Sequence, residues 1–131
     1  MYKSVLEIGD QKYYLNNLNL NAYGLDQEQE ESYSGNNNIS FSIRKTDQAL
    51  WDWVINDPRK KKSLTVRVYE TDDNQPFMTI SVKNAMCASY SLNHYATNEN
   101  GPELNLTVNY EKSTVKIHEK SQASTGGKRD E

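Results

Sequence analysis

The chain has 131 residues, of which 35% are hydrophobic and 25% are charged, and its formal net charge is −3. This length allows one domain with a single modest core, and the charge lacks the basic footprint of a nucleic-acid-binding protein. The single cysteine excludes an internal disulfide, and the sequence shows neither a signal-peptide core nor an apolar stretch long enough for membrane insertion.

The first half of the chain alternates between apolar and polar residues in the manner of β-strands. A short strand over 6–8 is followed by a turn at 9–10 and by a long strand in which Tyr14, Leu18, Leu20 and Ala22 share a face. Asn16 interrupts that face and predicts a bulge. Residues 24–38 are polar and lack periodicity, which indicates a long exposed loop.

After a strand over 39–43, the segment TDQALWDWVIN at 46–56 predicts the one helix. Thr46 is the expected N-cap, and Asp47 suits the positive end of the helix dipole. The apolar residues of this helix are too many for a solvated face, so at least one side should pack. Pro58 should end the helix, and a basic run follows at Arg59, Lys60, Lys61 and Lys62.

The second half of the chain predicts further strands around 64–69, 77–82, 86–92, 104–110 and 115–117, with turns at 72–75 and 98–102. About seven strands and one inserted helix favour a mainly β fold. We expect a two-sheet antiparallel β-barrel or sandwich with one short flanking α-helix. The expected domain covers residues 1–118, and residues 119–131 are expected to form a polar C-terminal tail.

The residue patterns contain no recognisable catalytic or ligand-binding motif. His94, His118 and Cys87 lack the neighbours that a metal site or an activated nucleophile needs, and no glycine-rich phosphate loop occurs. We therefore expect no catalytic residue, no metal and no cofactor, and a binding or structural role instead of an enzyme. Trp51 and Trp53 suggest packing in the core or at an interface, and the basic run is interpreted as a solvated helix end.

The order of these elements resembles the Hcp family, the tube protein of type VI secretion systems, and most of all its Bacteroidota-type variants. The resemblance covers about residues 3–117. It is carried by the early strand with its polar loop, the helix TDQALWDWVIN, the hairpin LTVRVYETDDNQPFMTISVKNA and the closing hairpin MCASYSLNHYATNENGPELNLTVNYE. The acidic QEQEE loop and the extended tail depart from the family pattern.

This resemblance implies hexameric rings that stack into a tube, which a contractile sheath expels behind a VgrG-type spike. It implies a cytoplasmic chain that is secreted without a signal peptide, with effectors as possible cargo in the lumen. By position, contacts between subunits would fall to loop residues Asp26, Glu28, Glu30, Glu31 and Tyr33. Trp51 and the basic run at 59–62 are further interface candidates, the latter as a partner for the acidic loop.

Two alternatives stay open at this stage. One is a monomeric ligand-binding β-domain of the carbohydrate-binding type, which would use Trp and Tyr side chains as platforms. The other is the tube protein of a phage tail or of an extracellular contractile particle, which would also form rings.

Overall fold

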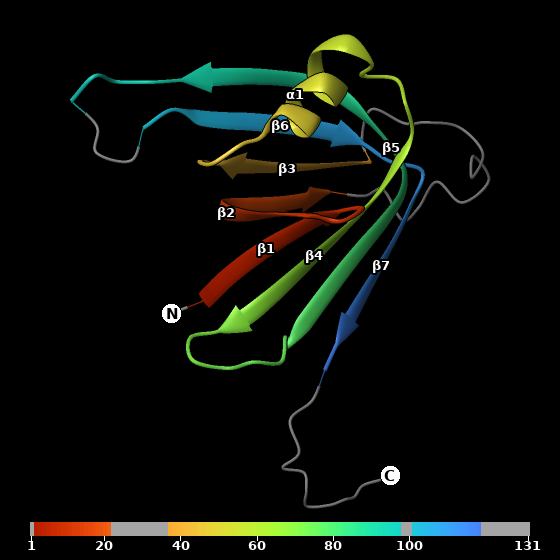
Figure 1. The fold of residues 1–131 in the computed structure, drawn as a ribbon. Helices are drawn as coiled ribbons and strands as arrows, with labels where there is room; N and C mark the ends of the chain where they lie inside the picture. Colours follow the sequence, from red (N-terminus) through yellow and green to blue (C-terminus); the bar gives the residue numbers. More distant parts are fainter. Residues whose placement is uncertain (1, 22–36, 98–100, 119–131) are drawn as a thin grey trace, which may run out of the picture.

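The computed structural model describes residues 2–21, 37–97 and 101–118 (Figure 1). Within these ranges the chain forms seven strands and one short helical segment inserted between the third and fourth strands. The strands are β1 (Tyr2–Ile8), β2 (Gln11–Asn21), β3 (Asn38–Ile43), β4 (Lys62–Glu70), β5 (Met78–Asn93), β6 (Glu103–Asn109) and β7 (Lys112–Ile117). The helical segment consists of α1 (Gln48–Trp51) and η2 (Asp52–Asn56).

Six strands close into an antiparallel barrel. Their order is β4-β1-β2-β3-β6-β5, and a further pairing between β5 and β4 completes the circle. The seventh strand, β7, lies outside the barrel, and its one partner in the described part of the chain is β5. The mainly β barrel with one flanking helix that the sequence predicts is therefore confirmed.

The strand β5 is long enough to pair with two strands, one after the other, along one of its edges. Its first part pairs with β7, with Lys83 opposite Lys112, and its second part pairs with β6, with Met86 opposite Asn109. On its other edge, β4 pairs with the first part only. In Figure 1 the second part of β5 and β6 lie at the top of the view, near the helix, and β7 runs downward beside the first part of β5.

Bulges decide which residues of the long strands face inward. The register of β2 against β3 shifts between Leu15 and Asn17, which confirms the bulge predicted at Asn16. The shift reverses the alternation before it, so Tyr13 is buried and Tyr14 is 66% exposed. The prediction that Tyr14 shares the face of Leu18 is therefore wrong, because the periodicity was continued through the bulge.

A second shift lies in β5, between Cys87 and Ser89. Cys87 is opposite the buried Val108 and packs partly against the core, whereas Tyr90 is opposite Leu106. Met86 and Ala88 therefore do not share one face with Tyr90 and Leu92, as an uninterrupted alternation predicted.

The core is formed by the inward faces of the barrel strands together with the helical segment that covers one opening. Alternate positions of β3, β4 and β6 are almost wholly buried, as their sequence alternation predicts. From the helical segment, Leu50, Trp53 and Val54 enter this core. The largest fully buried side chains are those of Tyr110, Phe41, Leu6, Ile39, Ile43, Leu50, Leu64, Leu104, Leu106, Val54, Val66 and Val82.

The helix begins differently from the prediction. Its N-cap is Asp47, whose Oδ1 accepts a hydrogen bond from the Leu50 N–H at 2.9 Å. The same oxygen accepts the Tyr13 hydroxyl at 2.8 Å, so one carboxylate caps the helix and ties it to β2. Thr46, the predicted cap, instead accepts a hydrogen bond from the Trp51 Nε1 at 2.8 Å.

Candidate assembly surface

The helical segment holds its following loop in place through Trp53. The indole of Trp53 is buried, and its Nε1 donates to the Lys60 carbonyl oxygen at 2.9 Å. The Lys62 Nζ lies 5.8 Å from the centre of the Trp53 ring, within range of a cation–π interaction. Trp53 is thus a core residue that also fixes the path of the basic run, and it does not offer a ring to an external ligand.

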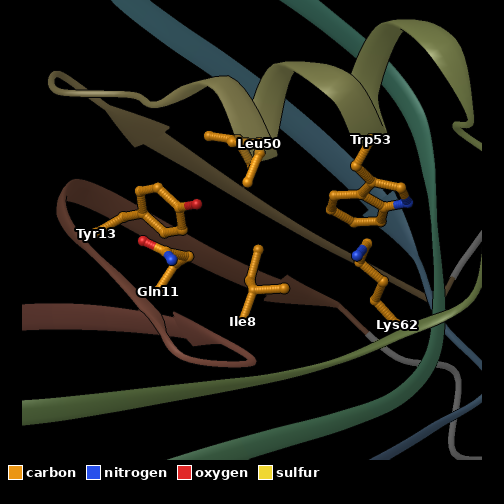
Figure 2. Close-up of a pocket in the computed structure, with 7 residues that line it drawn as sticks. Ile8, Gln11, Tyr13, Leu50, Trp53 and Lys62 are labelled. Carbon is orange, nitrogen blue, oxygen red and sulfur yellow. The ribbon is translucent and has the colours of Figure 1, made fainter.

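A small cavity lies between the helix and the turn that joins β1 to β2 (Figure 2). In Figure 2, the side chains of Leu50 and Trp53 point from the helix into the cavity, and those of Ile8 and Lys62 lie opposite them. Its volume is about 60 Å³, whereas sites for small molecules usually measure on the order of 300–1,000 Å³. This cavity therefore offers no room for a sugar or a nucleotide.

The basic run leaves the helix on the outside of the molecule. Arg59, Lys60 and Lys61 are exposed, and Lys62 is half-buried at the start of β4. The Lys60 N–H donates to the Asp57 carbonyl oxygen at 3.0 Å, which shapes the loop after the helix. The structure thus presents three cationic side chains to solvent beside the capped opening of the barrel.

Trp51 lies at the boundary between the core and the surface. Its half-buried indole meets the ring of Tyr90 edge to face, with 6.0 Å between ring centres. Tyr90 itself is 46% exposed, and its neighbour on the same face, Leu92, is 53% exposed. Trp51 therefore supports an aromatic and aliphatic surface on the second part of β5.

This second part of β5 is also an open sheet edge. Among the described residues, 89–93 pair with β6 on one side only, and the last backbone contact on the other side is the Cys87 N–H with the Pro58 carbonyl oxygen at 2.8 Å. The strand β7 is a second open edge, because its one strand partner within the described residues is β5. Val115 and Ile117 of β7 are 49% and 54% exposed. Unpaired edges with apolar side chains are typical sites of association with another chain.

The residues with chemical potential are dispersed over the fold. His94 follows β5 and is exposed, whereas a ring nitrogen of His118 lies 2.9 Å from the Thr79 hydroxyl. Burial raises the pKa of the Cys87 thiol above its usual value, which disfavours the reactive thiolate. Among the described residues, no group of three or more His, Cys, Asp and Glu side chains is placed to hold a metal ion. Nor does any helix in this part of the chain have the length and apolar character to cross a membrane.

The sequence-based site residues fall into two sets. The predicted loop contacts Asp26, Glu28, Glu30, Glu31 and Tyr33 lie outside the described residues. Trp51 ends α1, and the run 59–62 follows η2 in the loop that leads into β4. Sequence reasoning missed the open edges of β5 and β7. The apolar alternation of these strands is visible in the sequence, but their strand partners are not.

Comparisons with known proteins give the family. The model for the hemolysin coregulated protein Hcp (TssD) matches residues 1–123. No curated protein matches the chain by sequence.

Solved structures show the same fold at low sequence identity. Hcp1 from Flavobacterium johnsoniae aligns with a TM-score of 0.68 at 15% identity, over 86% of this chain and 94% of that one. Hcp1 from Salmonella typhimurium aligns with a TM-score of 0.69 at 10% identity, over 89% and 88% of the two chains. A chain of the PVC sheath–tube complex, an extracellular contractile injection system, aligns with a TM-score of 0.64 at 20% identity, over 89% and 90%. With its barrel, its covering helix and a family match across nearly its whole length, this chain belongs to the Hcp (TssD) family.

Proposed function

We propose that this protein is the inner-tube subunit of a type VI secretion system. The observation that carries the proposal is the family match over residues 1–123, on a fold shared with Hcp1 proteins. In this role the chain assembles into hexameric rings that stack into a tube. Its work is structural, with no catalysis and no cofactor.

The two open edges give physical support to self-assembly. A ring of identical subunits needs a heterologous interface, in which two different surfaces of the subunit meet and the rotation closes. A closed barrel alone offers no strand edge for this purpose, whereas β5 and β7 each offer one, with apolar side chains exposed on it.

The partners follow from the same proposal. A contractile sheath surrounds the tube, a VgrG-type spike caps its tip, and effectors are candidate cargo in the lumen. The tube is assembled in the cytoplasm and leaves the cell with the firing of the sheath, without a signal peptide.

Stacking between rings is proposed to use charge. The acidic loop residues Glu28, Glu30 and Glu31, flanked by Asp26 and Tyr33, would meet the basic run at 59–62 of an adjacent subunit. Arg59, Lys60 and Lys61 are exposed, as this role requires. Reversing the charge at the three glutamates should weaken stacking more at low salt than at high salt. Tube formation that is unchanged at both salt concentrations would contradict this pairing.

A related role is favoured by a specific observation. The PVC sheath–tube chain shares the fold at 20% identity, so the tube of an extracellular contractile particle is the second candidate. A monomeric ligand-binding domain has less support, because Trp53 is buried and the cavity beside it is small.

Oligomeric state tests the proposal directly. Native mass spectrometry and negative-stain imaging of the purified chain should show six-membered rings, with short stacks at high protein concentration. A chain that stays monomeric at all concentrations would overturn both tube assignments and leave the ligand-binding domain. Capture of the chain with its sheath from the producing cells then distinguishes the two kinds of tube.

A further inference from the structure

The outer surface of the barrel consists of two halves with different chemistry. Successive side chains of a strand point to opposite faces, so the residues that alternate with the core residues lie on the outer face. One half is formed by β2 beyond its bulge, β3, β6 and the second part of β5, and the other by β1, β4, the first part of β5 and β7. In Figure 1, β2, β3 and β6 lie in the upper part of the view, and β1, β4 and β7 lie below them.

The first half, which we name the neutral face, has three rows of opposed residues across four strands, and none of these residues is charged. The rows are Asn17-Ser42-Asn105-Ser91, Asn19-Ser40-Thr107-Ser89 and Asn21-Asn38-Asn109-Met86. Only Met86 among them is not Asn, Ser or Thr. At the margins, the carboxylates of Glu103 and Glu111 accept hydrogen bonds from Asn16 and Asn84. A quarter of the chain is charged, so a surface of this composition is unusual.

The second half, which we name the charged face, is cationic. Its opposed positions in the described part of the chain carry one anion, Glu7, and five cations, which are Lys3, Arg67, Lys83, Lys112 and Lys116. Glu7 is already in an ion pair with Arg67. Lys83 and Lys112 are directly opposite each other and both exposed, although like charges in this arrangement repel. Two faces that met the same surroundings would have no reason to differ in this way.

The polar side chains of the neutral face bind one another across the strands. The Asn21 Nδ2 donates to the Asn38 Oδ1 at 3.1 Å, and the hydroxyls of Ser40 and Thr107 lie 3.1 Å apart. Each amide and hydroxyl group has only a few donor and acceptor sites, so these bonds use part of the capacity of the face. The neutral face is therefore better suited to brief contact with a polypeptide than to tight docking.

The charge of a wall decides what enters the channel behind it. A cleft lined by one sign of charge raises the local concentration of oppositely charged molecules by about 10- to 1,000-fold. At physiological salt this field extends about 8 Å from the wall. A tube repeats each wall charge in every subunit of every ring, so even one charge in each subunit forms a charged lining. A wall without charged residues avoids this selection.

We propose that the neutral face lines the lumen of the tube, and that the lumen therefore accepts and releases polypeptides of either net charge. The inference rests on the proposed function, which supplies the tube and its cargo. The residues of the neutral face set what the lumen accepts. The charged face then points away from the lumen, and salt has little effect on passage through it.

Labelling with thiol reagents of two sizes tests the orientation. In a Cys87→Ser chain, Asn19→Cys places an exposed thiol on the neutral face, and Thr114→Cys places one on the charged face. A small maleimide should label both positions in subunits and in tubes. A maleimide on a polyethylene glycol too wide for the lumen should label Thr114→Cys in tubes and leave Asn19→Cys unlabelled. Labelling of Asn19→Cys by the wide reagent in intact tubes, or protection of Thr114→Cys, would overturn the orientation.

Methanethiosulfonate reagents of equal size and opposite charge measure the potential at each thiol. In tubes, the ratio of the cationic to the anionic reaction rate at Asn19→Cys should stay within about twofold of the ratio for a small free thiol at every salt concentration. At Thr114→Cys, between Lys112 and Lys116 on the same face, the anionic reagent should react faster at low salt and lose this advantage at high salt. A larger departure at Asn19→Cys that salt removes would overturn the proposal.

A charge placed on the neutral face is the matched test. Asn17→Asp changes an exposed residue to one of nearly the same shape, two positions from Asn19 on the same face. It should leave ring formation intact and raise the cationic-to-anionic ratio at Asn19→Cys about fivefold at low salt, with a larger rise in tubes than in subunits. Thr65→Asp on the charged face is the control and should leave this ratio unchanged. An equal shift from both variants, no shift from Asn17→Asp, or loss of rings on Asn17→Asp would contradict the proposal.

The native mass of the unmodified chain separates the two possible failures. Monomers at all concentrations would overturn the proposed function together with this inference. Tubes whose neutral face reacts with the wide reagent, or whose lumen ratio depends on salt, would overturn the inference alone.

Discussion

The closed barrel and the two strand segments that extend beyond it, the second part of β5 and the strand β7, belong to one sheet and contain the same residue types. They differ in burial. Leu104 and Leu92 face each other across β6 and β5, yet the first has no exposed surface and the second is 53% exposed. Ile80 and Val115 repeat this contrast across β5 and β7, with 4% and 49% exposure. The register of a strand therefore sets the face of a side chain, whereas the elements above that face set its burial. The two open edges thus show the apolar alternation of core strands, but their inner-face side chains are only half covered.

The largest expected effect is a difference in folding stability between variants of Leu104 and Leu92. Leu104→Ala should lower the free energy of unfolding by about 2–5 kcal/mol, because it removes a fully buried side chain and leaves a cavity. Leu92→Ala, its register partner, should cost less than about 1 kcal/mol in the isolated subunit and should weaken ring formation instead. Urea unfolding at low protein concentration measures the first effect, and native mass spectrometry measures the second. Equal losses of stability would show that the second part of β5 is part of the core.

The next effect concerns the carboxylate that ties the helix to the barrel. Asp47→Ala removes the cap of the Leu50 N–H and the acceptor of the Tyr13 hydroxyl, so it should cost about 2–3 kcal/mol in urea unfolding. Thr46→Ala is the control, since Thr46 does not cap the helix and its hydroxyl accepts from the Trp51 indole. If Thr46→Ala lowered the stability more than Asp47→Ala, Thr46 would be the helix cap, as the sequence first predicted.

A third pair of variants compares a core residue of the helical segment, Val54, with a residue at its surface, Trp51. Val54→Ala should cost about 2 kcal/mol in stability with little effect on assembly, because Val54 is buried in the core. Trp51→Ala should affect ring assembly more than folding, because Trp51 is half-buried and supports Tyr90. Thermal unfolding compared with ring yield measures both. The opposite ranking would place Trp51 in the core and remove it from the interface.

The smallest effect is a dependence on alkaline pH. Burial, the hydrogen bond to Asp47 and its charge raise the pKa of the Tyr13 hydroxyl well above its usual value. The folded state thus keeps a proton that the unfolded state loses above about pH 10, and this contribution to stability falls as the pH rises. The loss is at most about 1.4 kcal/mol per pH unit.

Tyr13→Phe isolates this contribution from the other titrating groups. The variant should be less stable than the unmodified chain at pH 8, and the difference between the two should shrink between pH 10 and 11. Urea unfolding at each pH measures the difference. A constant difference would mean that Tyr13 does not titrate differently in the two states.

Much of the fold was predictable because alternation with a period of two is a local property. It predicted the inward positions of β3, β4 and β6, and the interruption at Asn16 predicted the bulge. The wrong assignments come from the consequences of such interruptions. Tyr14 and Met86 were assigned by continuing an alternation past a shift, and the cap was assigned to Thr46 although Asp47 has a better acceptor in reach of both Leu50 and Tyr13.

The candidate site was predictable only where it depends on one segment. Trp51 and the basic run were identified from the helix and its end, and the structure leaves Trp51 half-buried and Arg59, Lys60 and Lys61 exposed. Tyr90, Leu92, Val115 and Ile117 were visible as strand residues. What sets them apart is that they stay about half exposed on the inner face, and this depends on strands distant in sequence.

The sequence by itself determined the element types, the single inserted helix and the lack of a catalytic motif, because these depend on short-range spacing and residue chemistry. Only the tertiary structure decided that β4 and β5 close the barrel, that β6 and β7 share one edge of β5, and that the end of β5 and the outer side of β7 stay open within the described residues. Strand pairing joins residues far apart along the chain, so no local pattern records it. The apolar residues of the open edges resemble core residues in the sequence, and the fold leaves them about half exposed.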